Sequence, residues 1–94
     1  MGRKSIERLK KDAEALQRRM SELGPLMRGS VVRIGTKNKQ YYFSLNKDKK
    51  TKLIYLGDKR VETARMFSDN YKKLLQIIEK VTILNMEILK RTEC

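Results

Sequence analysis

Apolar residues near the N-terminus recur at intervals of three and four positions, the period of one face of an α-helix. The set comprises Ile6, Leu9, Ala13, Leu16, Met20 and Leu23. Ser5 precedes this stripe and can accept hydrogen bonds from first-turn amides, while Gly24 and Pro25 end the segment. The stripe fits the buried face of a helix packed on its own domain, and it fits equally a short intermolecular coiled coil of nearly three heptads.

The pattern changes between residues 28 and 55, where three short runs are rich in β-branched and aromatic residues. They are SVVRI (30–34), QYYFSL (40–45) and KLIY (52–55), separated by residues 35–38 and by residues 46–50. Short runs of this kind, bounded by Gly, Asn and Asp, predict two successive hairpins, and therefore a β-meander. Because side chains alternate along a strand, Tyr41, Phe43 and Leu45 share one face. We expect that face to pack on a helix and the opposite face to carry part of the basic charge.

A second, longer helix is predicted after the meander. Gly57 and Asp58 open it, with Asp58 as N-cap and Glu62 in the first turn. No Gly or Pro follows from Lys59 to the end of the chain, so the helix can run for about 30 residues. Its apolar stripe is wider than one seam, which indicates more than one neighbour. Asn85 lies on that stripe, where it either fixes register or reaches water.

This second helix exceeds the first by roughly a third of its length. If the two pair antiparallel, the last turns of the second helix lack cover, and Ile83, Leu84, Ile88 and Leu89 are exposed on a monomer. Exposed apolar patches usually mark interfaces, so a homodimer is expected. The predicted interface lies along Tyr71, Leu74, Ile78, Val81, Asn85 and Ile88.

The fold class that follows is α+β, in a single domain over residues 1–94. It consists of an N-terminal helix (1–26), a basic three-stranded antiparallel β-meander (27–57) and a long C-terminal helix (58–94). The two helices are expected to pack as a coiled-coil-like pair.

Charge points to an anionic partner. The chain has 23 Lys and Arg against 11 Asp and Glu, a net charge of +12. Ten of these basic residues, with only two acids, fall in residues 27–60. Such a balance favours nucleic acid, DNA more than RNA, over a membrane surface. The expected phosphate contacts are Arg28, Arg33, Lys37, Lys39, Lys47, Lys49, Lys50 and Lys52, with Tyr42 as the aromatic residue facing the partner.

The same lysines also fit a different role, because hairpin tips and edge strands often carry Lys for solubility and to block edge pairing. A structural or adaptor protein, whose helices bind a larger protein partner, is therefore the alternative function.

Composition argues against catalysis. His is absent and Cys94 is the single cysteine, so the chain offers no disulfide framework, no metal cluster and no acid–base or nucleophile assembly. No enzymatic activity, cofactor or metal is predicted. The chain lacks a secretory signal and an apolar run of membrane-spanning length, so a cytoplasmic location is expected, with no membrane partner.

Three short motifs followed by a helix carry a resemblance: RGSVVRIG (28–35), YYFSL (41–45) and LIYLG (53–57). Their order resembles a family of small uncharacterised prokaryotic proteins, some of them encoded near mobile elements. Members often carry Cys and His around the first turn, where GTKNKQYYF (35–43) has neither, so no metal role is predicted from the resemblance. The strand–strand–strand–helix order also resembles, in topology, the arm-type DNA-binding domain of tyrosine recombinases, a likeness that by itself decides no function.

Overall fold

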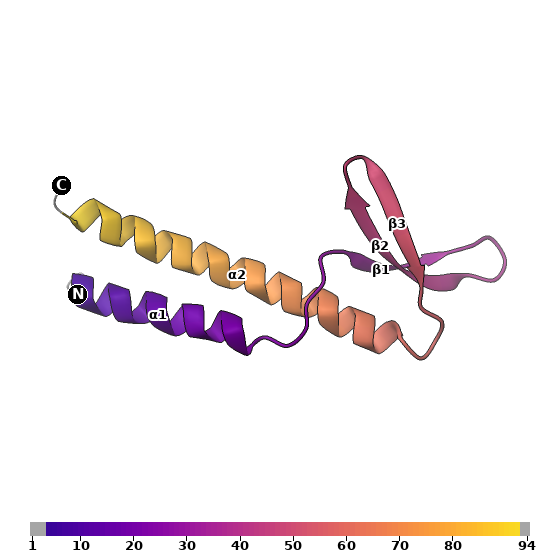
Figure 1. The fold of residues 1–94 in the computed structure, drawn as a ribbon, viewed down its shortest axis with the longest axis horizontal. Helices are drawn as coiled ribbons and strands as arrows, with labels where there is room; N and C mark the ends of the chain where they lie inside the picture. The colour runs from indigo at the N-terminus through magenta and orange to yellow at the C-terminus, as the bar shows by residue number, and fades with distance from the viewer. Residues whose placement is uncertain (1–3, 93–94) are drawn as a thin grey trace. The chain divides into compact units, whose positions relative to one another are not determined.

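The computed structural model describes residues 4–92, so Cys94 lies outside the described residues. The elements follow the order α1 (Ile6–Glu22), β1 (Ser30–Ile34), β2 (Gln40–Lys47), β3 (Lys50–Tyr55) and α2 (Val61–Arg91) (Figure 1). This order confirms the predicted α+β architecture of helix, meander and long helix. The chain forms two compact units: a helical unit, made of α1 and the α2 residues from Lys73 onward, and a sheet unit, made of Gly24–Lys72.

In the helical unit, α1 packs against α2 in the antiparallel sense (Figure 1). Ser5 caps α1 as predicted, because its hydroxyl accepts a hydrogen bond from the Arg8 amide at 3.2 Å. Leu9 and Ala13 are buried on α1, and Ile77 and Val81 are buried on α2. The apolar stripe of α1 is thus covered within its own chain, and the predicted helix pair is confirmed.

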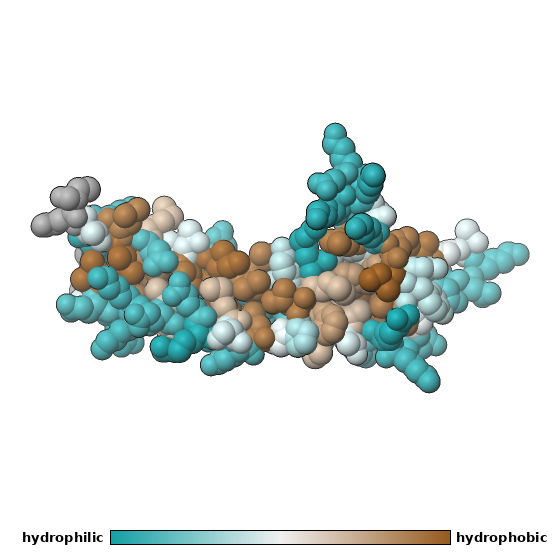
Figure 2. Space-filling view, in the orientation of Figure 1, coloured by the Kyte–Doolittle hydropathy of each residue, from teal (hydrophilic) through white to brown (hydrophobic). Residues whose placement is uncertain are grey.

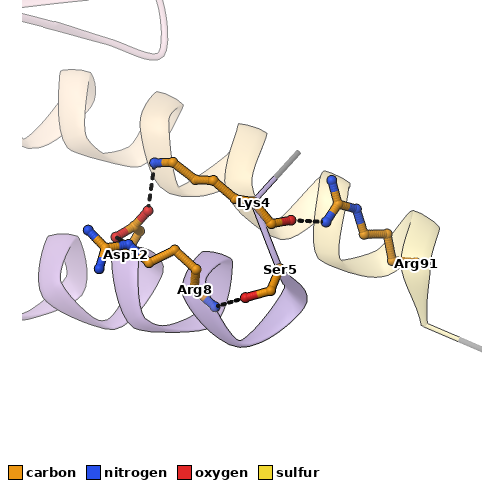
Figure 3. Close-up of polar contacts among 5 residues, drawn as sticks. All are labelled: Lys4, Ser5, Arg8, Asp12 and Arg91. Carbon is orange, nitrogen blue, oxygen red and sulfur yellow. Dashed lines mark hydrogen bonds and ion pairs between the residues drawn. The ribbon is translucent and has the colours of Figure 1, made fainter. Parts of the chain in front are cut away.

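Polar contacts join Lys4, just before α1, to the last turn of α2 and to Asp12 of α1 (Figure 3). The Arg91 guanidinium donates to the Lys4 carbonyl, and the Lys4 ammonium lies 2.9 Å from the Asp12 carboxylate. The hydrogen bond that the Lys4 ammonium donates to Asp12, with the positive charges of Lys4 and Arg8 nearby, lowers the pKa of Asp12.

The prediction that the last turns of α2 lack cover from α1 is therefore wrong. Within the helical unit, α1 pairs with the later turns of α2, as the contact between Arg91 and Lys4 shows. Ile83 and Leu89 remain exposed, at 66% and 74%, because a single helix covers one side of α2 only. Leu84 and Ile88 are half-buried.

The sheet is a three-stranded antiparallel meander in the order β1-β2-β3. Its second connection is shorter than the predicted stretch of residues 46–50, because Lys47 pairs directly with Lys50. Asp48 and Lys49 form the turn with φ of 53° and 64°. Two successive positive φ values are typical of the hairpin turn whose twist matches the strands, so pairing continues to the tip.

The core of the sheet unit forms where the sheet meets the first turns of α2. Phe43, at 2% exposure, is buried with Leu56, Val61 and Ala64, and this confirms Phe43 on the face turned toward the helix. Met27, Val31 and Tyr41 pack around this cluster. Two hydrogen bonds join the segment just before β1 to α2. The Ser68 hydroxyl donates to the Gly29 carbonyl at 2.8 Å, and the Met27 amide donates to the Phe67 carbonyl at 3.1 Å.

α2 begins later than predicted, at Val61. The Arg60 carbonyl accepts the Ala64 amide at 3.0 Å, which makes Arg60 the capping position in place of Asp58. Residues 57–60 form a turn, in which the Arg60 guanidinium donates to the Leu56 and Tyr55 carbonyls at the end of β3. Glu62 lies in the first turn as predicted. Among the described residues, no helix has the length and apolar character needed to cross a bilayer.

Candidate nucleic-acid interface

The two faces of the sheet differ sharply in charge. We call the face that holds Phe43 the inner face and the opposite one, which holds Tyr42, the outer face. Strand register and alternation put ten side chains on the outer face, none of them charged: Ser30, Val32, Ile34, Gln40, Tyr42, Ser44, Asn46, Thr51, Leu53 and Tyr55. The expectation that this face carries part of the basic charge is therefore wrong. Alternation places Arg33 and Lys52 on the inner face, and most other basic residues of the meander lie in turns or at strand ends.

The outer face instead presents aromatic and hydrogen-bonding groups. The rings of Tyr42 and Tyr55 meet edge to face, with centroids 5.6 Å apart. The Tyr55 hydroxyl donates to Gln40 Oε1 at 3.3 Å, and the Thr51 hydroxyl donates to Asn46 Oδ1 at 2.7 Å. Tyr42 is half-buried on this face. These contacts hold the side chains in place while leaving further donors and acceptors for a ligand.

Four lysines gather at the tip of the β2–β3 hairpin. Lys47 lies directly opposite Lys50, Lys52 follows on the same face, and Lys49 occupies the turn. The tip is covered by hydrophilic side chains in Figure 2. A shallow hollow of about 270 Å³ is lined by Lys47, Asp48, Lys50 and Lys52. We call Lys47, Lys49, Lys50 and Lys52 the tip cluster.

Within the part of the chain that the structure describes, the positive charges of the tip cluster are not neutralised by ion pairs. Within residues 4–92, none of its four ammonium groups forms a hydrogen bond or ion pair, although Asp48 lies in the same turn. Like charges directly opposite one another on antiparallel strands are destabilising. An anion bound between Lys47 and Lys50 would relieve that repulsion.

Two arginines of the predicted site have structural partners. Arg28 donates from Nη1 to the Asn46 carbonyl at 2.9 Å, and so ties the entry to β1 to the end of β2. Arg33 lies over the Tyr41 ring, 5.3 Å from its centroid, and Arg65 of α2 lies over the same ring at 5.8 Å. Arg65 was missed from the sequence because it lies on the helix, four residues beyond Val61, whereas its partner Tyr41 lies on β2. A guanidinium stacked on an aromatic ring keeps its N–H groups at the ring's edge, so both arginines can still meet an anion.

Lys37 and Lys39 lie in or beside the β1–β2 turn, and both are exposed. With Arg33 they form a second basic group, the turn cluster. The turn cluster and the tip cluster lie at opposite ends of β2. Lys39 and Lys47 are separated by eight residues, or about 26 Å of extended strand. The sheet therefore has two basic ends and an uncharged outer face between them.

The predicted oligomer interface is divided by the structure. Leu74, Val81 and Ile88 belong to the side of α2 that packs on α1; Val81 is only 8% exposed, and the other two are half-buried. Because Val81 is buried within one chain, it is not available to a second copy. Ile78 and Asn85 are exposed, and Tyr71 is half-buried on the sheet-unit part of α2. The interface predicted as one stripe thus follows the border between a buried and an exposed side of the helix.

The site offers no recognisable metal-binding group, since no set of three His, Cys, Asp or Glu side chains comes together among residues 4–92. No protein-family model matches the chain, and no curated protein or solved structure is significantly similar to it.

Proposed function

We propose that this protein is a non-enzymatic nucleic-acid-binding protein that contacts the phosphates of duplex DNA through its β-meander. The observation that carries the proposal is the tip cluster: four lysines without an ion-pair partner among residues 4–92, two of them directly opposite one another and three of them lining a hollow. Placing like charges together costs stability, and a phosphate backbone supplies the compensating charge.

The distribution of charge over the sheet supports a duplex as the ligand. The distance of about 26 Å between the two basic ends exceeds the major-groove width of about 12 Å, so the clusters can reach the two backbones that border a groove. Lys47, Lys50 and Lys52 share the inner face at one end, and Lys37 and Lys39 lie in or beside the turn at the other. In this arrangement the lysines at both ends position the duplex by its phosphates.

The alternative function, an adaptor bound to a larger protein, is favoured by the exposed apolar residues of α2, including Leu75, Ile78 and Leu89. Those residues lie on the helical unit and not on the meander. The two functions can therefore be separated by testing the lysines directly.

The first prediction is that the variant K47Q/K49Q/K50Q loses DNA affinity. At about 0.1 M salt, three lost phosphate contacts should weaken binding roughly several hundred-fold, because each contact contributes about 0.9 to the logarithmic salt slope. Fluorescence anisotropy with a labelled duplex measures the affinity. Circular dichroism checks that the variant remains folded, as expected when exposed turn and strand-end residues are changed.

A matched control removes three exposed positive charges from α1, in the variant K10Q/K11Q/R18Q. This control should lose less than about tenfold in affinity, since it weakens only the general attraction between the positively charged protein and the negatively charged DNA. Equal losses in the two variants would show that binding is spread over the surface, and would contradict a dedicated site on the meander.

A further inference from the structure

α2 carries two apolar seams along the helical unit, and only one of them is covered. The first seam, which packs on α1, consists of Leu74, Ile77, Val81, Leu84 and Ile88. The second seam, shifted around the helix, consists of Leu75, Ile78, Thr82, Asn85 and Leu89. Both follow the alternating spacing of three and four that keeps residues on one line of a helix.

The second seam is open on the single chain. Leu75 is 44% exposed, Ile78 43% and Leu89 74%, and Met86 at its border is 55% exposed. Figure 2 shows apolar side chains in patches along the helices, bordered by hydrophilic ones. Heptad spacing is the pattern that meshes with the side chains of another helix. The spacing therefore selects a helical partner.

The two polar residues of the second seam are compatible with burial. The Thr82 hydroxyl donates to the Ile78 carbonyl at 2.7 Å, so its hydrogen bond is made within the helix and its methyl group can pack. Asn85 is exposed, and its amide both donates and accepts. An identical amide opposite it, as in two parallel copies in register, can satisfy both groups.

The charge of α2 around the second seam indicates which partner helix can bind there. Glu79, Lys80 and Glu87 are the charged residues of the stretch 74–89, which has a net charge of −1 in a chain of net charge +12. At 3.6 residues per turn, Lys80 and Glu87 lie on the side of α2 away from the second seam, and Glu79 lies at its border. A second basic chain can approach this stretch without repulsion, whereas a phosphate backbone finds no positive charge on the seam.

We propose that the second seam binds the same seam of a second copy of this chain, with the two α2 helices parallel and each Asn85 facing the partner's Asn85. The interface is symmetric, so one seam serves both subunits. This proposal rests on the helical unit and does not depend on binding of nucleic acid by the meander.

The experiment measures dimerisation of the full chain, without nucleic acid, after substitution of either of two isoleucines of α2. Sedimentation equilibrium should give twice the chain mass for the wild type at several hundred micromolar. Ile78→Glu should raise the dimer dissociation constant at least 100-fold, because the carboxylate is buried in an apolar seam. Ile83→Glu, on the other side of the same helix and 66% exposed, should leave the constant within about threefold of wild type.

Cross-linking tests the register. In a Cys94→Ser background, Asn85→Cys should form a disulfide between copies under mild oxidation, since facing positions meet the distance requirement of that bond. Gln76→Cys, an exposed position off the seam, should not. A monomeric wild type, equal effects of the two glutamate substitutions, or cross-linking at Gln76→Cys but not at Asn85→Cys would each overturn the proposal.

Discussion

Replacing Phe43 with Ala is expected to lower the free energy of unfolding of the sheet unit by about 3–5 kcal/mol. The Phe43 ring is 2% exposed and lies at the centre of the cluster formed with Leu56, Val61 and Ala64. Its removal leaves a cavity where the sheet meets α2, and the paired strands cannot easily close around it. Since small domains are stable by only about 5–15 kcal/mol, this loss is a large fraction of the total.

All four tyrosines lie in the sheet unit, and the chain has no Trp, so tyrosine fluorescence during urea unfolding follows this unit. The midpoint for Phe43→Ala should fall by at least 1 M urea, given the usual dependence of about 1–3 kcal/mol per molar. Leu53→Ala is the control: Leu53 is 47% exposed on the outer face, and its loss should cost less than about 1 kcal/mol. A Phe43→Ala loss no larger than that of the control would mean that the core lies elsewhere.

Gly29→Ala should be of comparable severity, on the order of 3 kcal/mol or more, from backbone strain together with a steric clash. Gly29 has φ of +139°, a conformation that residues with a side chain rarely adopt. A Cβ atom there would lie 2.5 Å from Cε1 of Phe43 and 2.6 Å from the Ser44 carbonyl oxygen. The oxygen is part of the backbone of β2, and the ring is fixed in the core, so neither can move away without cost.

Gly57→Ala separates these two causes. Gly57 also has a positive φ, +63°, but an added Cβ would meet only the Tyr55 ring, at an ordinary 3.6 Å. It should therefore cost only the conformational part, about 1–2 kcal/mol. The same urea experiment measures both variants, and a cost for Gly29→Ala that matches Gly57→Ala would show that no clash occurs.

Periodicity was sufficient to predict the architecture. The stripe from Ile6 to Leu23 predicted α1, and Ser5 its cap, because both depend on local spacing and on one side-chain hydroxyl. The face of Phe43 followed from the alternation of side chains along β2. These features depend on residues close together in the chain, so the sequence pattern is sufficient to predict them.

Features that depend on pairing between elements were missed. The extension of β2 and β3 to Lys47 and Lys50 depends on positive φ at Asp48 and Lys49, neither of which is a glycine. The uncharged outer face follows from the register of three strands, which total charge does not reveal. Similarly, the division of the α2 stripe into two seams depends on where α1 packs, so Val81 could not be recognised as intramolecular core from its spacing alone.

The tip cluster illustrates the same limit at the candidate site. The sequence predicted eight phosphate-contacting residues as one group, although two of them, Arg28 and Arg33, have partners within the chain. The structure brings Lys47, Lys50 and Lys52 around one hollow and leaves Lys37 and Lys39 at the other end of β2. The distance between these two basic ends is set by the length of β2, which runs from the β1–β2 turn to the β2–β3 turn.

The measurement that tests the central claim most directly is the salt dependence of binding to a duplex DNA of about 20 base pairs. If about five lysines or arginines of each meander neutralise phosphates, the slope of log K against log salt should be near −4.5 for one engaged subunit and near −9 for two. A duplex bound without measurable salt dependence, or no binding at about 50 mM salt, would contradict phosphate recognition by the meander.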